Sequence, residues 1–223
     1  MIDWPPRSVV AVCAHPDDES FGMGAILAAF GLAGSSTGVV TFTAGEASTL
    51  GMDLGPLSKV RSAEMAEAAE VLGVRRTLLL DYPDGRLSET PVDELCRHVT
   101  SLAQLMAAEA LLAFDVGGVT GHPDHQQATE AALAAGEVLQ VPVLGWAVRS
   151  DVAATLNREF PASFIGRGAE EIDMNLPVDR QVQLRAIACH RSQSSDNPVL
   201  WRRLEATGAV EPLRWLSRPV GQH

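Results

Sequence analysis

Basic residues are scarce in this chain, and no long apolar run occurs in it. Seventeen Lys and Arg residues stand against 28 Asp and Glu residues, which gives a formal net charge of −11. This surplus of negative charge repels phosphate groups and argues against nucleic acid or an anionic membrane as a partner. There is no membrane-spanning run of about 18 apolar residues, and the first residues lack the segments of a secretory signal. We therefore expect a soluble, cytoplasmic protein that binds a small neutral or cationic molecule.

Cysteine is also rare, and the glycine fingerprint of a dinucleotide site is missing. Cys13, Cys96 and Cys189 lie far apart and form no CxxC pair. We expect them to be buried free thiols in a reducing compartment, with no thiolate metal site. The Gly-Met-Gly at 22–24 follows the first expected strand, but Leu27 stands where a third glycine would be needed. A nucleotide site of that type is therefore excluded.

Short apolar runs rich in β-branched residues alternate with alanine-rich stretches of helical spacing. The runs predict strands buried on both faces, at residues 8–14, 38–43, 77–81, 111–116 and 143–148. The helical stretches cover residues 20–33, 57–72, 92–108 and 123–135. This alternation predicts an α/β fold, a Rossmann-like, mostly parallel sheet with helices on both faces.

Length and hydrophobic content fit a single domain over residues 1–223. The chain has 223 residues with 46% hydrophobic composition, enough to bury a sizeable core without splitting. Weaker patterns predict a strand near 171–178 and a helix at 179–190. The tail that follows Ser192 has no clear pattern, and we expect a short C-terminal elaboration there.

The segment directly after the first expected strand reads AHPDDES, at residues 14–20, and places one histidine beside three carboxylates. In doubly wound sheets, ligands bind in the crevice at the carboxyl ends of the strands. Acids at the start of a helix can also act as caps, an alternative that accounts for one or two of the three. It does not explain the histidine together with all three acids, so we expect a chemical site.

A second segment, TGHPDH at residues 120–125, repeats this layout after the expected strand at 111–116. Parallel strands point the same way, so the two segments can converge at one edge of the sheet. His15, Asp18 and His125 would then supply two imidazoles and one carboxylate. Three protein ligands with a position open for water are typical of catalytic zinc sites. Magnesium or manganese stays an open alternative.

Together, AHPDDE at 14–19 and HPDH at 122–125 make the chain resemble the LmbE-like, or PIG-L, family of N-acetylglucosaminyl de-N-acetylases. The further matches are TAGE at 43–46, Arg61 with Glu64 in one helix, PDG at 83–85 and HRSQ at 190–193. The resemblance covers the core at about residues 8–195 and leaves the tail 196–223 outside it.

The resemblance implies a role for each matched residue around one zinc ion per chain. The implied metal ligands are His15, Asp18 and His125. Asp17 would be the general base, and His122 would assist at the oxyanion or the leaving amine. Asp124 would orient a histidine, although Pro123 and Asp124 alternatively only begin a helix.

Substrate contacts are also implied by the resemblance, from Glu46, Arg61 and Asp84. For Arg61 a helix-surface ion pair with Glu64 is an alternative. The resemblance further implies residues that line or brace the site, namely His190, Ser192 and Gln193. Specificity is expected in the segments 47–56 and 146–164 and in the tail, because these match the family least.

These residues meet the requirements of amide hydrolysis. Zinc with an open position lowers the pKa of bound water from about 15.7 toward about 7. Asp17 can accept the proton of the water and pass it to the amine, a role worth roughly 100-fold to 10,000-fold in rate. His122 can stabilise the oxyanion. We therefore expect a zinc-dependent hydrolase that removes an acyl group, acetyl first of all, from an N-acylated amino sugar or a related small amide.

Two other function classes stay open. A metal-containing binding module would hold a ligand without turnover, although it needs neither Asp17 nor an open metal position. A metal-dependent phosphoesterase would usually use two metals about 3.5 to 4 Å apart, or a basic phosphate cradle. Glu19 and Asp124 could serve in such a site, but Lys and Arg are scarce around both motifs. The sequence leaves the natural substrate and a homo-oligomer undecided.

Overall fold

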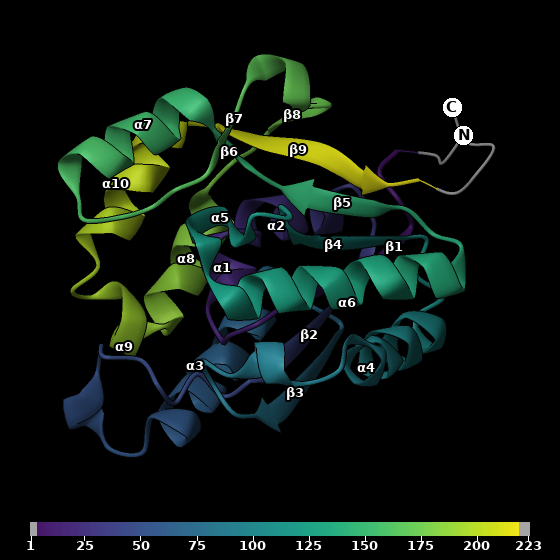
Figure 1. Ribbon diagram of the computed structural model, residues 1–223, viewed down its shortest axis with the longest axis horizontal. Helices are drawn as coiled ribbons and strands as arrows, with labels where there is room; N and C mark the ends of the chain where they lie inside the picture. The colour runs from purple at the N-terminus through teal and green to yellow at the C-terminus, as the bar shows by residue number, and fades with distance from the viewer. Residues whose placement is uncertain (1–3, 219–223) are drawn as a thin grey trace.

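A seven-stranded sheet runs through the middle of the computed structural model, which describes residues 4–218. The strand order is β3-β2-β1-β4-β5-β9-β8 (Figure 1). The strands are β1 (Ser8–Cys13), β2 (Ser36–Thr43), β3 (Arg76–Tyr82), β4 (Ala110–Phe114), β5 (Val143–Trp146), β8 (Met174–Pro177) and β9 (Val210–Ser217). A separate pair joins β6 (Val148–Arg149) to β7 (Gly166–Arg167).

The first five strands of this order are parallel, and the last two run antiparallel to their neighbours. β1 lies at the centre, where Val10 pairs with Gly38 of β2 and with Leu111 of β4. β9 comes from the C-terminal tail and pairs with β5, and β8 pairs with β9. The predicted mostly parallel sheet is confirmed, and the tail supplies one of its strands.

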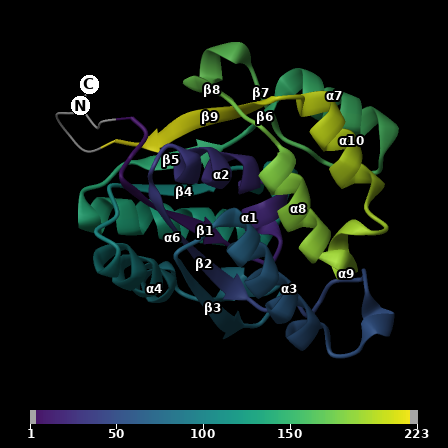
Figure 2. The same ribbon diagram turned by 180° about the vertical axis from the view of Figure 1, so that it is seen from behind.

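Helices cover both faces of the sheet. One face carries α2 (Gly24–Leu32), α3 (Leu57–Leu72) and α8 (Gln181–Cys189) (Figure 2). The other face carries α4 (Val92–Leu105) and α6 (Pro123–Leu139), which lie in front of the sheet in Figure 1. Beyond one end of the sheet, α7 (Ser150–Glu159) packs beside α10 (Pro198–Thr207). The short helices are α1 (Asp18–Phe21), α5 (Gly118–Gly121), α9 (Arg191–Ser194) and the 3₁₀ turns η1 (Met52–Leu54), η2 (Leu87–Glu89) and η3 (Ala169–Glu171).

The core consists of two apolar layers, one on each face of the sheet. In β1, Val9 and Ala11 face the layer of α2 and α3, while Val10 and Val12 face the layer of α4 and α6. All four side chains are buried, as expected for a central strand with helices on both faces. The central strands therefore hold the loops at their carboxyl ends on a rigid base.

Three predictions need correction. The strand at 77–81 is not buried on both faces, because β3 is an edge strand with half-buried and exposed side chains. The helix predicted at 20–33 is two helices, α1 and α2, separated near Gly22. A side chain at Gly22 would collide with the ring of Phe114, so the glycine permits this close approach. Cys13 and Cys96 are buried as predicted, but Cys189 is only half-buried.

Across residues 4–218, we find no helix with the length and apolar character needed to span a membrane.

Candidate metal centre

The carboxyl ends of β1 and β4 bring the two histidine motifs together. These strands pair in parallel, so the segments that follow them emerge at the same edge of the sheet. His15 and Asp18 follow β1, and α1 begins at Asp18. His122 and His125 follow β4 at the start of α6. The structure therefore places the residues of both motifs beside one another, as the sequence predicts.

Three ligand atoms surround one point between these loops. Nε2 of His125 lies 3.2 Å from Nδ1 of His15 and 3.2 Å from Oδ1 of Asp18. One ligand atom from each of His15, Asp18 and His125 lies within 4.8 Å of the other two. Two ligands on a tetrahedral zinc, each at about 2.0 to 2.1 Å, lie about 3.4 Å apart. The three atoms therefore have the spacing of ligands around a single ion.

The hydrogen bonds of both histidines direct a lone pair toward that point. Nδ1 of His125 lies 3.1 Å from the carbonyl oxygen of Gly118, so this nitrogen carries the proton and Nε2 is left as an acceptor. Nε2 of His15 lies 3.0 Å from Oδ1 of Asp84 and 3.3 Å from Oδ2 of Asp124, so Nδ1 is left as an acceptor. In the neutral ring of His15 these two acceptor atoms face one another, and a bound cation would take the place of a proton between them.

The local charge also favours a cation. Burial lowers the pKa of His15, but its hydrogen bonds to Asp124 and Asp84 and the charge of Asp18 outweigh burial and raise the pKa to about 10. Burial raises the pKa of Asp18, but the charge and hydrogen bond of His125 lower it below its usual range. Carboxylates that stabilise a proton on His15 would equally stabilise a metal ion that replaces this proton.

Backbone groups fix the orientation of Asp18. Its Oδ2 accepts hydrogen bonds from the backbone N–H groups of Ala14 and His15, each at 2.9 Å. Oδ1 is thereby directed to His125. The side chain is buried and cannot rotate without losing both bonds.

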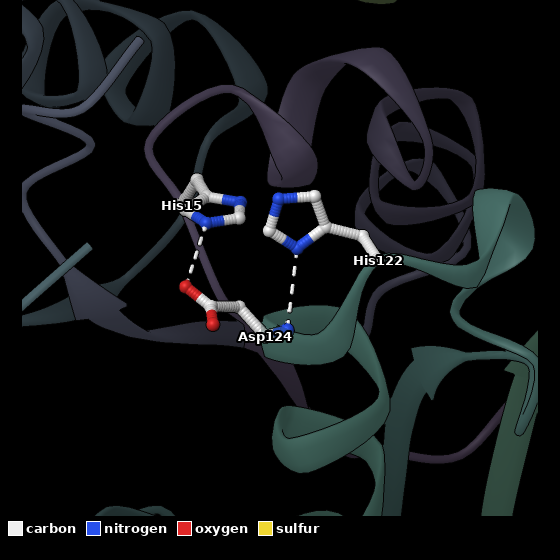
Figure 3. Close-up of side chains that lie close together, drawn as sticks. All are labelled: His15, His122 and Asp124. Atoms are coloured by element: carbon white, nitrogen blue, oxygen red, sulfur yellow. Dashed lines mark hydrogen bonds and ion pairs between the residues drawn. The ribbon is translucent and has the colours of Figure 1, made fainter. Parts of the chain in front are cut away.

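Asp124 binds Nε2 of His15, the ring nitrogen that does not face the candidate metal position (Figure 3). It is fully buried, and its Oδ1 and Oδ2 accept the backbone N–H groups of Leu87 at 3.0 Å and Gly85 at 2.8 Å. Its own backbone N–H donates to Nδ1 of His122 at 3.2 Å. His15, His122 and Asp124 form a second, overlapping group with metal-ligand spacing. This group fits a metal less well, because the oxygens of Asp124 and Nδ1 of His122 already accept hydrogen bonds.

His122 lies at the edge of the candidate metal site as the N-cap of α6. Its ring centroid is 5.0 Å from that of His15 and 4.9 Å from that of His125. Burial and the charges of His125 and His15 lower its pKa. A neutral imidazole that accepts a hydrogen bond at Nδ1 carries its own proton on Nε2. His122 is therefore arranged as a hydrogen-bond donor.

Asp17 is held in a left-handed backbone conformation, with φ 118° and ψ −26°. A non-glycine residue there is strained and needs support from its surroundings. Glu19 accepts the N–H of Asp17 at 2.9 Å, and Nη2 of Arg61 donates to Oδ2 of Asp17 at 2.9 Å. Burial raises the pKa of Asp17 to about 6, against the opposing charge of Arg61.

Arg61 is buried rather than at a helix surface. Its Nη1 donates to the carbonyl oxygen of Gly45 at 2.6 Å. Glu64 is buried too, and it accepts the backbone N–H of Ser192 at 2.8 Å and its hydroxyl at 2.6 Å. The alternative of a surface ion pair between Arg61 and Glu64 is therefore wrong. Arg61 instead links α3 to Asp17.

A cavity of about 520 Å³ opens over this centre. Eight of the residues predicted from the sequence line it, namely His15, Asp17, Asp18, Arg61, Asp84, His122, His125 and Gln193. Glu46 does not line it and is exposed, and its Oε1 accepts the backbone N–H of Asp84 at 3.0 Å. Other lining residues were not singled out from the sequence, among them Phe21, Phe114, Trp146, Phe164, Leu200 and Arg203. The last four lie in or near segments where specificity was expected.

The likeness to solved structures concerns the fold. The N,N'-diacetylchitobiose deacetylase of Pyrococcus horikoshii superposes with a TM-score of 0.66 at 22% identity, covering 94% of this chain and 84% of that one. The 4-carboxy-2-hydroxymuconate hydratase of Pseudomonas putida KT2440 superposes with a TM-score of 0.72 at 16% identity, covering 97% and 99%. The same fold therefore carries more than one reaction.

Sequence comparison is more specific. The family model of PIG-L, the GlcNAc-PI de-N-acetylases, matches residues 10–136. The 1D-myo-inositol 2-acetamido-2-deoxy-alpha-D-glucopyranoside deacetylase 1 of Catenulispora acidiphila is 29% identical over 197 residues, which cover 74% of this chain and 60% of that protein. The chain spans about half to three fifths of the length of several such relatives. The matched region is more than half of the chain and holds both histidine motifs, so this protein belongs to the PIG-L family.

Proposed function

We propose that this protein is a metal-dependent hydrolase that removes an acyl group from the amide nitrogen of an N-acylated amino sugar, with zinc as the metal. One observation carries the proposal. Two imidazole lone pairs and a carboxylate oxygen surround one point in a cavity, with a further carboxylate, Asp17, beside them. Two nitrogens and one oxygen within 4.8 Å of one another suit zinc.

The proposed metal ligands are His15, Asp18 and His125, and Asp17 is the proposed base. A zinc ion held there would lower the pKa of a bound water toward about 7. Asp17 accepts the proton of the attacking water and then delivers it to the departing amine. Arg61 and Glu19 restrain the side chain and the backbone of Asp17, so the base stays in place through both transfers.

His122 is the proposed oxyanion donor. Its Nδ1 accepts the N–H of Asp124, so an added proton there would oppose an existing donor. Nε2–H is then the group that can donate to the developing negative charge on the carbonyl oxygen. Asp124 and Asp84 act through His15, whose Nε2 they hold. Glu46 acts one step further out, because it holds the backbone of Asp84.

The amino sugar follows from the relatives and from the cavity. The named activity of the relatives is removal of the acetyl group from a 2-acetamido sugar. One side of the cavity carries polar side chains suited to hydroxyl groups, namely Ser48, Arg61, Asp84 and Gln193. We infer that residues 1–223 act as one catalytic domain to which the tail contributes α10 and β9.

The two alternative functions have less support. Among residues 4–218, both groups with metal-ligand spacing contain His15, so they do not form separate sites for the two metals of a phosphoesterase. Glu19 is fully buried and bound to His190, so it is not available as a ligand for a second metal. A binding module would not need a base restrained as Asp17 is.

The test is release of acetate and primary amine from a panel of N-acetylglucosamine derivatives. Zinc-loaded protein is compared with chelated protein, with Asp17→Ala, and with Asp93→Ala, an exposed acid of α4, as the matched control. We expect metal-dependent release that Asp93→Ala retains and Asp17→Ala loses by roughly 100-fold or more. Sugar binding without release at one zinc per chain would favour the binding module. Release that continues after zinc is removed would overturn the proposal.

A further inference from the structure

The cavity over the metal centre has a polar half and an apolar half. The polar half lies toward β2 and β3, and the apolar half lies toward β5 and the tail. The metal ligands come from loops after β1 and β4, at the middle of the sheet. On the side of β2 and β3, the lining side chains are Ser48, Arg61 and Asp84. On the side of β5 and the tail, the apolar lining side chains are Trp146, Phe164, Val199 and Leu200, beside the polar Asn197 and Arg203. The candidate metal centre therefore lies between two chemically different surfaces.

Aromatic residues are concentrated in the apolar half. The whole chain has six Phe, four Trp and one Tyr. Three of the phenylalanines and one tryptophan line this cavity, namely Phe21, Phe114, Phe164 and Trp146. The ring centroid of Phe114 lies 4.8 Å from that of the metal ligand His125. The apolar surface therefore begins directly beside the candidate metal site.

The indole of Trp146 is fixed in the cavity wall, and its one polar group is already bonded. Its indole N–H donates to Oε2 of Glu211 at 2.7 Å, and both side chains are buried. The guanidinium of Arg203 lies over the ring, 5.0 Å from its centroid, and donates to the carbonyl oxygen of Phe21. Arg203 lines the cavity, but its Nη1 is buried and has no hydrogen-bond partner among the described residues. The apolar half is thus preformed.

Phe164 is held in this wall by its neighbours. Asn157 of α7 accepts the N–H of Phe164 at 2.7 Å and donates to its carbonyl oxygen at 2.9 Å. The next residue, Ile165, donates its N–H to the carbonyl oxygen of Val119 at 2.7 Å. Val119 belongs to α5, directly before the second motif, and also lines the cavity. The loop of Phe164 is therefore attached to the candidate catalytic segment.

We propose that this apolar half is an acyl-binding compartment, and that the protein prefers aliphatic N-acyl groups longer than acetyl. The proposal rests on the hydrolase function proposed above. In an amide bound at the metal, the acyl group and the amine lie on opposite sides of the carbonyl carbon. With the hydroxyl-rich amine on the polar half, the acyl chain faces Phe114, Trp146 and Phe164. An acetyl group would leave most of this preformed apolar surface uncovered.

The experiment compares kcat/KM for N-acetyl-, N-butyryl- and N-hexanoylglucosamine on the zinc-loaded full chain. We expect a rise of about fourfold per added methylene until the compartment is full, the value of burying one such group. Phe164→Ala should lower the ratio of hexanoyl to acetyl kcat/KM by about tenfold or more. Both substrates are measured on one sample, so this ratio does not depend on the fraction of the variant that is folded.

Two further variants sharpen this comparison. Phe160→Ala removes the same side chain four residues earlier, where it packs on the core and does not line the cavity, and it should leave the ratio as in the wild type. Val199→Trp fills the compartment from α10 and should remove the preference for hexanoyl. N-acetylglucosamine glycosides with alkyl aglycones of increasing length test whether the aglycone occupies this surface instead.

The outcomes separate this proposal from the function on which it rests. If acetate is released and kcat/KM falls as the acyl chain lengthens, the proposed hydrolase function is supported and the acyl-binding compartment is contradicted. Phe164→Ala could instead lower the ratio of long-chain to short-chain kcat/KM only among the alkyl glycosides. This result would contradict the acyl-binding compartment and assign the apolar half to the aglycone. No amine from any substrate would overturn the hydrolase and, with it, the acyl assignment.

Discussion

Nε2 of His190 lies 2.6 Å from Oε1 of Glu19, and both side chains are fully buried. The other oxygen of Glu19 accepts the backbone N–H of Asp17. The ion pair therefore supports the strained backbone of the proposed base through one carboxylate. Because α8 ends beside His190, this contact also joins the C-terminal part of the chain to the first motif.

The stability from this pair should depend on pH. Burial lowers the pKa of His190, but the charge and hydrogen bond of Glu19 and the charges of Asp17 and Glu64 outweigh burial and raise it above its ordinary 6.5. The stabilisation is then fully present below about pH 6.5 and is lost as pH rises through the raised value. His190→Gln keeps a donor but no charge, and should lower the free energy of unfolding by about 1–3 kcal/mol at low pH.

Urea unfolding of the wild type and His190→Gln at pH 6 and pH 9 measures this difference. His98→Gln, at a half-buried histidine bonded to Tyr82, is the matched control. A difference between wild type and His190→Gln that grows toward pH 9 would contradict the assigned charge state.

Asp124→Asn should weaken metal binding without removing a ligand. The change deletes the charge that holds Nε2 of His15, and loss of such a partner typically lowers metal affinity by about 10-fold to 100-fold. Competition with a chromogenic chelator gives the zinc Kd. Glu130→Gln alters the same charge at an exposed position of α6 and should bind zinc as the wild type does. If Asp124→Asn and the control bind zinc with equal affinity, the charge of Asp124 does not contribute to metal binding.

Gly45→Ala should disturb the base through Arg61. Gly45 has φ +68°, and a Cβ there would collide with the guanidinium of Arg61, which binds Asp17. Displacement of a positioned group by about 1 Å can lower the rate about 100-fold. Gly73→Ala is the control, because it has a similar φ of +71° with open space around it. Steady-state kinetics should show a loss of kcat in Gly45→Ala alone, and equal losses would assign the effect to backbone strain.

The motif residues could be predicted because local sequence and topology decide their place. His15 and Asp18 directly follow a central strand, and His125 follows its parallel neighbour. Parallel pairing alone then brings their loops to one edge of the sheet. The strands β1, β2, β4 and β5 were predicted for a similar reason, since their burial on both faces gives continuous apolar runs.

Other features depend on contacts between distant residues, which sequence spacing does not reveal. Glu19 and His190 are 171 positions apart, and Trp146 and Glu211 are 65 apart. β9 was missed because it contains Pro212, and proline within a run argues against a strand. Glu46 was expected at the substrate, but its turn directs it to the backbone of Asp84.

The metal content of single variants tests the central claim most directly. Wild type, His125→Ala and His122→Ala are loaded with zinc and desalted, and the zinc per chain is measured by mass spectrometry. The ligand set His15, Asp18 and His125 predicts one zinc in the wild type, loss of zinc in His125→Ala, and retention with loss of amidase activity in His122→Ala. Zinc retained by His125→Ala, or lost by His122→Ala, would contradict this assignment and favour the group of His15, His122 and Asp124.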